Sequence, residues 1–212
     1  VDSAGLRFTN EGASYHHFCE DMIRRHALGP AIPAWLVCDA AFVKKYGLGL
    51  IHPGTTHLKP HVKSGYLHVG DTLEELARRI GVDADGLKDS VARNNAYAVT
   101  GVDVDYGKGS TEVSRFNGDP DHGPNPCLGP IAQAPFCAMA LWPADAAADA
   151  GLSTTEHAQV LDSDGQPIAG LYACGNDAAS LMRGTYPGPG ATIGPAMVFG
   201  YIAALHASSL SH

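Results

Sequence analysis

The segment between residues 184 and 195 contains the residue types that let a protein backbone come close to a ligand. Glycine has no side chain to keep a ligand away, and proline stiffens the chain. Pro195 suits the first residue of a helix, and the residues after it are apolar all round, which predicts a buried helix. The loop residues concerned are Gly184, Gly188, Gly190, Gly194, Pro187, Pro189 and Pro195.

The start of this helix could bind a cofactor. A helix N-terminus leaves backbone N–H groups unpaired and carries about half a positive charge. We therefore expect the N–H groups of Ala191, Thr192 and Ile193 to face an electron-rich atom of a ligand. The same residues also fit a tight structural connection ahead of a core helix, and the loop alone leaves both interpretations open.

Two common phosphate-binding turns are absent from the sequence. Gly107 and Lys108 resemble part of a P-loop, but Gly109 stands where serine or threonine is needed, and residue 102 is valine instead of the leading glycine. No G-x-G-x-x-G turn opens a strand–turn–helix unit. The usual turn for a dinucleotide pyrophosphate is therefore missing from these residues.

Structural roles explain several other polar residues and a cysteine better than catalytic or metal-binding roles do. Asp119 and Asp121 flank Pro120 and are typical of a turn, and Cys174 ends an apolar run as a small core residue would. Four histidines crowd one loop, but their spacing fits no helix face and no known metal site, so we expect no metal; they are His52, His57, His61 and His68.

Periodicity and capping residues predict the elements of the first half. We expect a helix after Ser14 that stops at Gly29, a strand over 34–38, and a brief helix from Asp39 to Gly47. Residues 51–67 are predicted to form a long loop. Two longer helices should follow, one with a capping box of Asp71 and Glu74 that closes at Gly81, and one from Asp83 to Gly101.

The second half is predicted to be less regular. Residues 103–135 are rich in turn formers, which argues against regular structure. The apolar runs 157–161 and 168–174 flank a turn and predict a hairpin, and we expect the part from Leu171 to Cys174 to act as a parallel strand in a larger sheet.

Composition narrows the class of protein. The 212 residues are 45% hydrophobic and carry a formal charge of −8, which is typical of a packed, acidic protein and disfavours nucleic acids and anionic membranes as partners. The longest apolar stretch, 196–207, is far shorter than the roughly 20 residues of a membrane span. Five scattered cysteines without a C-x-x-C pair favour a reducing, cytoplasmic setting. Because the chain starts at Val1 without methionine, we expect a fragment or a processed chain.

Several sequence blocks, in this order along the chain, resemble flavoprotein dehydrogenases of the 3-ketosteroid Δ1-dehydrogenase type, within the fumarate reductase/succinate dehydrogenase flavoprotein superfamily. The run Tyr-Pro-Gly-Pro-Gly-Ala-Thr-Ile-Gly-Pro at 186–195 is specific to this type. The supporting blocks are Gly-Leu-Arg-Phe-Thr-Asn-Glu at 5–11, Asp-Thr-Leu-Glu-Glu-Leu-Ala at 71–77, Pro-Cys-Leu-Gly-Pro-Ile at 126–131, and Leu-Tyr-Ala-Cys-Gly-Asn at 171–176.

This resemblance implies an α/β architecture in two parts. Residues 1–149 would form most of an α+β substrate domain, and residues 150–212 the C-terminal part of a Rossmann-like FAD domain whose N-terminal βαβ unit is missing. The implied cofactor is FAD, held in part by Gly175, Asn176, Ala191, Thr192 and Ile193.

The resemblance also implies a reaction and its catalytic residues. The enzyme would introduce a carbon–carbon double bond next to the ketone of an apolar ring substrate such as a 3-ketosteroid. The Tyr186 hydroxyl and the Gly190 N–H would stabilise the enolate-like oxygen. Tyr15 would take the proton, although from spacing alone Tyr15 fits a packed aromatic at a helix start and Tyr186 a loop aromatic against the prolines.

Two other functions remain open at this stage. A fumarate reductase-like enzyme would need cationic side chains to bind carboxylates, and the region around Tyr186 offers only Arg183. A non-catalytic chain could instead complete the FAD site of a partner. Whichever function holds, we expect the chain to be silent alone and to need the missing N-terminal half, a partner chain or a homo-oligomer.

Overall fold

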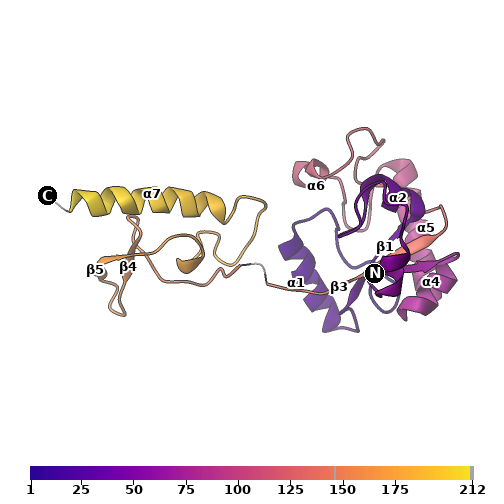
Figure 1. The fold of residues 1–212 in the computed structure, drawn as a ribbon, viewed down its shortest axis with the longest axis horizontal. Helices are drawn as coiled ribbons and strands as arrows, with labels where there is room; N and C mark the ends of the chain where they lie inside the picture. The colour runs from indigo at the N-terminus through magenta and orange to yellow at the C-terminus, as the bar shows by residue number, and fades with distance from the viewer. Residues whose placement is uncertain (146, 211–212) are drawn as a thin grey trace. The chain divides into compact units, whose positions relative to one another are not determined.

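The computed structural model describes residues 1–145 and 147–210 of the chain. It divides into two compact units, Val1–Pro143 and Ala144–His212, which we call unit 1 and unit 2 (Figure 1). The mixture of helices and strands confirms the expected fold class. The domain boundary expected between residues 149 and 150 stays a prediction.

Unit 1 is built around a three-stranded antiparallel sheet of order β1-β3-β2. Cys38 lies opposite Cys137 in the register of β1 and β3, and His68 lies opposite Ala138 in that of β2 and β3. The elements of this unit are α1 (Tyr15–His26), β1 (Ala34–Asp39), α2 (Ala40–Tyr46), α3 (Lys59–Lys63), β2 (His68–Gly70), α4 (Leu73–Ile80), α5 (Ala84–Thr100), α6 (Glu112–Phe116) and β3 (Phe136–Leu141).

The sheet carries an apolar cluster on each face because successive side chains of a strand point to opposite sides. The helix-side cluster joins the sheet to α4 and α5 and consists of Leu76, Ala77, Ile80, Val82, Leu87, Val91 and Ala138. The α2-side cluster consists of Cys38, Val43, Leu48, Ile51, Leu67 and Cys137. Trp35 and Val37 pack against the first cluster, and Leu36 packs against the second.

Most of the predicted helix ends are confirmed. The Asp39 carboxylate accepts the N–H of Phe42 at 2.9 Å, and the Asp83 carboxylate accepts that of Gly86 at 2.7 Å. Gly101 closes α5 with a left-handed φ of 76°, a conformation that favours glycine. Ser14 likewise caps α1, and Gly81 closes α4.

Two predicted ends were wrong. The N-cap of α4 is Thr72 and not Asp71, because the Thr72 hydroxyl accepts the N–H of Glu75 at 3.1 Å while the Glu75 carboxylate accepts that of Asp71 at 2.9 Å. Helix α1 ends at His26 and not at Gly29, since the His26 ring accepts the N–H of Ala31 and the chain turns before the glycine.

The loops predicted over 51–67 and 103–135 contain the short helices α3 and α6, and strands β2 and β3 were not predicted. Helix α6 is capped locally, by a bond from the Ser114 N–H to the Thr111 hydroxyl at 3.2 Å. Strand β3 has no polar alternation because it is the central strand, with Cys137 and Ala138 both buried. Its identity as a strand therefore depends on its two partners in the sheet.

Unit 2 contains β4 (Gln159–Leu161), β5 (Pro167–Tyr172), the 3₁₀ turn η1 (Gly175–Asp177) and α7 (Ile193–Ser209). The predicted hairpin is confirmed, with Leu161 opposite Pro167. The Tyr172 hydroxyl lies 2.8 Å from Nδ1 of His206, which links α7 to the hairpin.

Two expectations for α7 in unit 2 were wrong. Helix α7 begins at Ile193 with Thr192 as N-cap, so Pro195 is its third residue, where its missing N–H still costs no helix bond. No described residue of α7 is buried, because the hairpin and η1 are too small to cover it; Tyr201 is 67% exposed. Strand β5 pairs with β4 in the antiparallel sense, as the predicted hairpin requires, and the parallel pairing of residues 171–174 in a larger sheet stays a prediction.

Candidate functional site

The loop before α7 has the backbone geometry that its glycines predict. Gly184 and Gly190 have φ values of 80° and 94°, and no atom lies within 4 Å of where a Cβ would stand on either residue. The loop turns on a bond from the Gly194 N–H to the Gly190 carbonyl at 2.9 Å. The glycines are therefore needed for backbone conformation and not for space.

Several N–H groups of this loop are available to a ligand. Those of Gly190, Thr192 and Ile193 meet no protein acceptor among the residues that the structure describes, and Thr192 makes no capping bond. The N–H of Ala191 is used within the loop, because it donates to the Gly188 carbonyl at 3.3 Å. The expectations that Ala191, Thr192 and Ile193 offer their N–H groups to a ligand stay predictions.

A small cavity of about 50 Å³ in unit 2 brings together four of the five residues expected at the cofactor: Gly175, Asn176, Ala191 and Thr192 all line it. Gly175 has a φ of 65°, and a Cβ on it would lie 3.2 Å from that of Ala196, so α7 approaches η1 closely at this point. Ile193 is outside the cavity lining and 64% exposed.

The expected catalytic residues come from both units. Tyr15 is the first residue of α1 in unit 1, and its side chain is 58% exposed. Tyr186 and Gly190 lie on the loop before α7 in unit 2, outside the lining of the small cavity. Their roles stay predictions.

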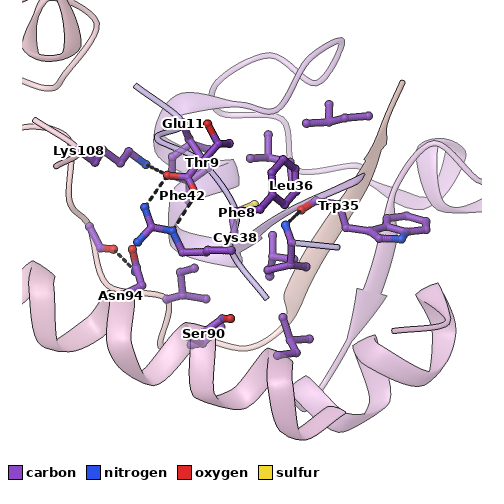
Figure 2. A pocket seen from close by; sticks show the side chains of 18 of the residues that line it. Phe8, Thr9, Glu11, Trp35, Leu36, Cys38, Phe42, Ser90, Asn94 and Lys108 are labelled. Atoms are coloured by element: carbon purple, nitrogen blue, oxygen red, sulfur yellow. Dashed lines mark hydrogen bonds and ion pairs between the residues drawn. The ribbon is translucent and has the colours of Figure 1, made fainter. Parts of the chain in front are cut away.

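Sequence reasoning missed a larger cavity of about 180 Å³ in unit 1. Apolar side chains form much of its wall, and a charged group closes one side: Lys108 points toward Glu11, and Ser90 and Asn94 reach toward the cavity from α5 (Figure 2). The only sequence feature that pointed to this cavity was the motif at 5–11, which contains Arg7 and Glu11. Lys108 and the two residues of α5 come from distant parts of the chain.

Arg7 organises the charged side of this cavity. Its Nη2 lies 2.8 Å from Oε2 of Glu11 and 2.9 Å from Oδ2 of the fully buried Asp103. Burial opposes ionisation of both carboxyls, but hydrogen bonds from Arg7 outweigh it and hold the pKa of Glu11 and of Asp103 below their ordinary values. The same ion pairs raise the pKa of Arg7.

The sequence predicts neither a metal site nor a membrane span. Within residues 1–145 and 147–210, no three His, Cys, Asp or Glu side chains lie close enough to hold a metal ion. None of the helices in the same ranges is long and apolar enough to cross a membrane.

Comparisons with known proteins agree with the resemblance seen in the motifs. The 3-oxosteroid 1-dehydrogenase of Mycobacterium tuberculosis H37Rv is 43% identical over 97% of this chain, and the 4-oxocyclohex-2-ene-1-carboxylate 5-dehydrogenase of Sinomonas cyclohexanicum is 43% identical over 95%. The chain spans 38% and 34% of these relatives' lengths, a little over a third.

Solved structures agree on the fold. The 3-ketosteroid Δ1-dehydrogenase of Sterolibacterium denitrificans, solved with 1,4-androstadiene-3,17-dione, superposes with a TM-score of 0.92 at 44% identity, over 97% of this chain and 37% of that one. A flavocytochrome c3 fumarate reductase has a TM-score of 0.58 at 24% identity over 96% of this chain and 31% of that one, which shows a shared fold alone.

The profile of the family described as FAD binding domain matches residues 1–193. This match covers most of the chain, including the motifs at 5–11 and 186–193, and it confirms the resemblance from which FAD was expected. The chain therefore belongs to the FAD binding domain family.

Proposed function

We propose that the protein to which this chain belongs is an FAD-dependent dehydrogenase that forms a carbon–carbon double bond next to a ring ketone, with a 3-ketosteroid-like substrate. The observation that carries the proposal is the loop before α7. It presents the Gly190 N–H without a protein acceptor among the described residues, four residues after Tyr186. The 43% identity to a 3-oxosteroid 1-dehydrogenase over nearly the whole chain supports it.

The residues present fit one end of FAD. The unpaired N–H groups of Thr192 and Ile193, at the N-terminus of a 17-residue helix, suit an electron-rich carbonyl, and Gly175 lets the backbone approach at the adjoining cavity. We assign Gly175, Asn176, Thr192 and Ile193 to this end of the cofactor, with Ala191 contributing as part of the cavity wall. When bound, FAD supplies the acceptor for the hydride that leaves the β-carbon.

Two groups on the loop before α7 would stabilise the charge that develops on the substrate. As the α-proton leaves, the ketone oxygen gains negative charge, and donors that are already in position lower the barrier because they need no reorganisation. The Tyr186 hydroxyl and the Gly190 N–H are these donors in our proposal. The stiff loop holds the N–H in place through the bond from Gly194 to the Gly190 carbonyl.

Tyr15 would receive the α-proton at its phenolate oxygen. A tyrosine hydroxyl has an ordinary pKa near 10, so it can act as a base only where its surroundings favour the anion or relay the proton onward. Tyr15 is the first residue of a 12-residue helix whose first turn contains no acidic residue. The partial positive charge of that N-terminus favours the phenolate.

The charge of unit 2 argues against the fumarate reductase-like alternative. From Ala144 onward the sequence has one arginine, Arg183, against six Asp and Glu residues, and no lysine. Such a surface repels a dicarboxylate, whereas an uncharged ketone is indifferent to it. The non-catalytic alternative predicts no turnover in the assay below, whereas our proposal predicts turnover.

The setting of the protein is also part of the proposal. Five cysteines are free among the described residues, which supports a reducing, cytoplasmic compartment. The exposed apolar side chains of α7 support a need for further chain, a partner or a homo-oligomer to cover them.

The test is an anaerobic assay of the full-length protein with bound FAD and an artificial electron acceptor. We expect 4-androstene-3,17-dione to be dehydrogenated, and 4-oxocyclohexanecarboxylate serves as the comparison for a small ring ketone. Turnover of 4-oxocyclohexanecarboxylate without turnover of the steroid would assign the substrate to small ring ketones instead of 3-ketosteroids. Reduction of fumarate by a reduced dye, or no turnover of any substrate by a flavin-loaded protein, would contradict the proposal.

A further inference from the structure

Residues 7–14 form the loop that leads into α1, and we call them the entry loop. Tyr15 is the first residue of that helix, so its hydroxyl is carried along by any shift of the loop or of the helix end. Within the loop, the side-chain oxygen of Asn10 accepts the N–H of Gly12 at 2.8 Å, and the Asn10 carbonyl accepts that of Ala13 at 3.1 Å. The entry loop is therefore a compact turn, and its attachments to the rest of unit 1 determine where Tyr15 lies.

Arg7 attaches the entry loop to the segment that follows α5. Its guanidinium donates to both carboxylate oxygens of Glu11, at 2.9 and 2.8 Å, and to both of Asp103, at 3.3 and 2.9 Å. A planar fork of donors can hold two carboxylates in this way, whereas the compact ammonium of lysine cannot. Arg7 thus fixes Glu11, four residues before Tyr15, against Asp103.

Asp103 gives this attachment a rigid support. Its side chain is fully buried. Its oxygens accept the backbone N–H groups of Asp105, Tyr106 and Lys108 at 3.1, 3.3 and 3.1 Å. The carboxylate cannot turn without leaving these groups unpaired, which is costly. The Tyr106 hydroxyl also donates to the Arg7 carbonyl at 2.9 Å, so the same segment holds both the side chain and the backbone of Arg7.

The entry loop also lies directly against α6. A Cβ on Gly12 would overlap the hydroxyl of Ser114. Ser114 is buried and its hydroxyl accepts the N–H of Gly109 at 2.8 Å, so turning it away would leave that N–H unpaired. Gly12 is therefore needed for this close approach, three residues before Tyr15.

Two further contacts join the entry loop to α1 itself. Thr9 is buried, and its hydroxyl donates to the Asp21 carboxylate at 2.6 Å. The rings of Phe8 and Phe18 lie 6.0 Å apart, a distance typical of packed aromatic pairs. Because these contacts reach the second turn of α1, the loop and the start of the helix move as one body.

We propose that Arg7, supported by Asp103, is a positioning residue that places the Tyr15 hydroxyl for proton transfer. The inference rests on the proposed function, in which Tyr15 receives the α-proton of the substrate. A general base must lie within hydrogen-bond distance of the proton that it takes, so a small shift of the helix end slows the transfer. Arg7 acts here through Glu11 and the entry loop, without touching substrate or cofactor.

The test compares Arg7→Lys with Arg25→Lys in the full-length, flavin-loaded protein. Arg25 is the matched control because it lies in the last turn of the same helix and its Nε donates to the buried Asp2 carboxylate at 2.7 Å. We expect Arg7→Lys to lower kcat for the ring ketone by about tenfold, since misplacement by about 1 Å can cost about 100-fold. KM should be unchanged, and Arg25→Lys should keep the kcat of the unaltered protein.

The same substitution in a Tyr15→Phe background separates positioning from a general loss of stability. If Arg7 acts through Tyr15, Arg7→Lys causes no further fall in kcat once the hydroxyl is absent. An equal fall in both backgrounds would overturn the inference and leave the proposed role of Tyr15 intact. Normal kcat in Tyr15→Phe would instead refute the role of Tyr15 in the proposed function, and the positioning role with it.

Gly12→Ala tests the entry loop without changing any charge. The added methyl group pushes the loop away from Ser114, so we expect kcat to fall in this variant too, again with KM unchanged. Gly29→Ala is its control, because Gly29 follows the other end of α1 and has open space where a Cβ would stand. Equal kcat in the two glycine variants, or in the two arginine variants, would contradict the proposal.

Discussion

At the scale of single residues, the proposed chemistry depends on Tyr186. Replacing Tyr186 with phenylalanine removes one hydroxyl and leaves the ring to pack against the loop. In the full-length enzyme we expect kcat to fall by about 100-fold, the typical effect of deleting one such donor, with flavin content unchanged. Loss of FAD without a rate effect in the flavin-loaded fraction would assign Tyr186 to packing.

Gly190 provides a second test at this scale, with an internal control. Alanine has room at both Gly190 and Gly184, but each position has a left-handed φ, so both substitutions carry a similar backbone strain of about 1 kcal/mol. Only Gly190→Ala shifts the N–H that we assign to the substrate oxygen. Turnover should therefore fall much further for Gly190→Ala than for Gly184→Ala, and equal losses would remove the Gly190 N–H from the site.

Arg7 and its two carboxylates predict a dependence of stability on pH. The pKa values of Glu11 and Asp103 lie below their ordinary values of 4.5 and 3.8, so their ion pairs stabilise the fold above those values. The stabilisation is lost as the pH falls from about 5 through the lowered pKa values, because in this range the unfolded state binds more protons than the folded state. Urea unfolding of the chain between pH 7 and pH 3 should show this decline.

Asp103→Asn removes the fully buried carboxylate and leaves Arg7 with one partner. We expect the free energy of unfolding at pH 7 to fall by about 3 kcal/mol, as for other broken buried pairs, and its decline toward low pH to become shallower. An unchanged pH dependence would show that other carboxylates dominate acid unfolding.

At the scale of elements, α4 depends on its N-cap, which is Thr72, one residue after the predicted Asp71. Thr72→Ala removes the acceptor for the Glu75 N–H, and we expect a loss of about 1 kcal/mol in the free energy of unfolding. Thr72→Ser keeps the hydroxyl and should stay close to the unaltered chain. If Asp71→Ala lowered the free energy of unfolding more than Thr72→Ala, the N-cap would be Asp71, as the sequence predicts.

At the scale of the whole molecule, we expect the 212-residue chain alone to be catalytically silent. The family's glycine turn for the pyrophosphate has no counterpart in the sequence, and only the end of the cofactor near Thr192 and Ile193 would be held. Titration of FAD into the purified chain, followed by flavin fluorescence, should show no stoichiometric binding at micromolar concentration. Tight binding, or steroid-dependent dye reduction by the chain alone, would contradict this expectation.

Local signals were sufficient for much of the fold. Asp39, Asp83 and Gly101 mark helix ends through bonds and backbone angles that involve only neighbouring residues, so their effect is visible in the sequence. The loop at 184–195 is equally local, because glycine and proline set its conformation wherever it is placed. The sequence by itself therefore determined the stiff loop, the helices with strong caps, and, through the specific run at 186–195, the family.

Tertiary structure decided the features that depend on distant partners. β3 is a strand because β1 and β2 pair with it on both sides, and its own residues carry no alternation that reveals this. The cavity of unit 1 combines Arg7, Asn94 and Lys108 from separate segments, and Asp103 becomes a partner of Arg7 only when the chain folds back over 96 positions. Pairing and burial of this kind are properties of the assembled chain, because no local pattern encodes which distant residues will meet.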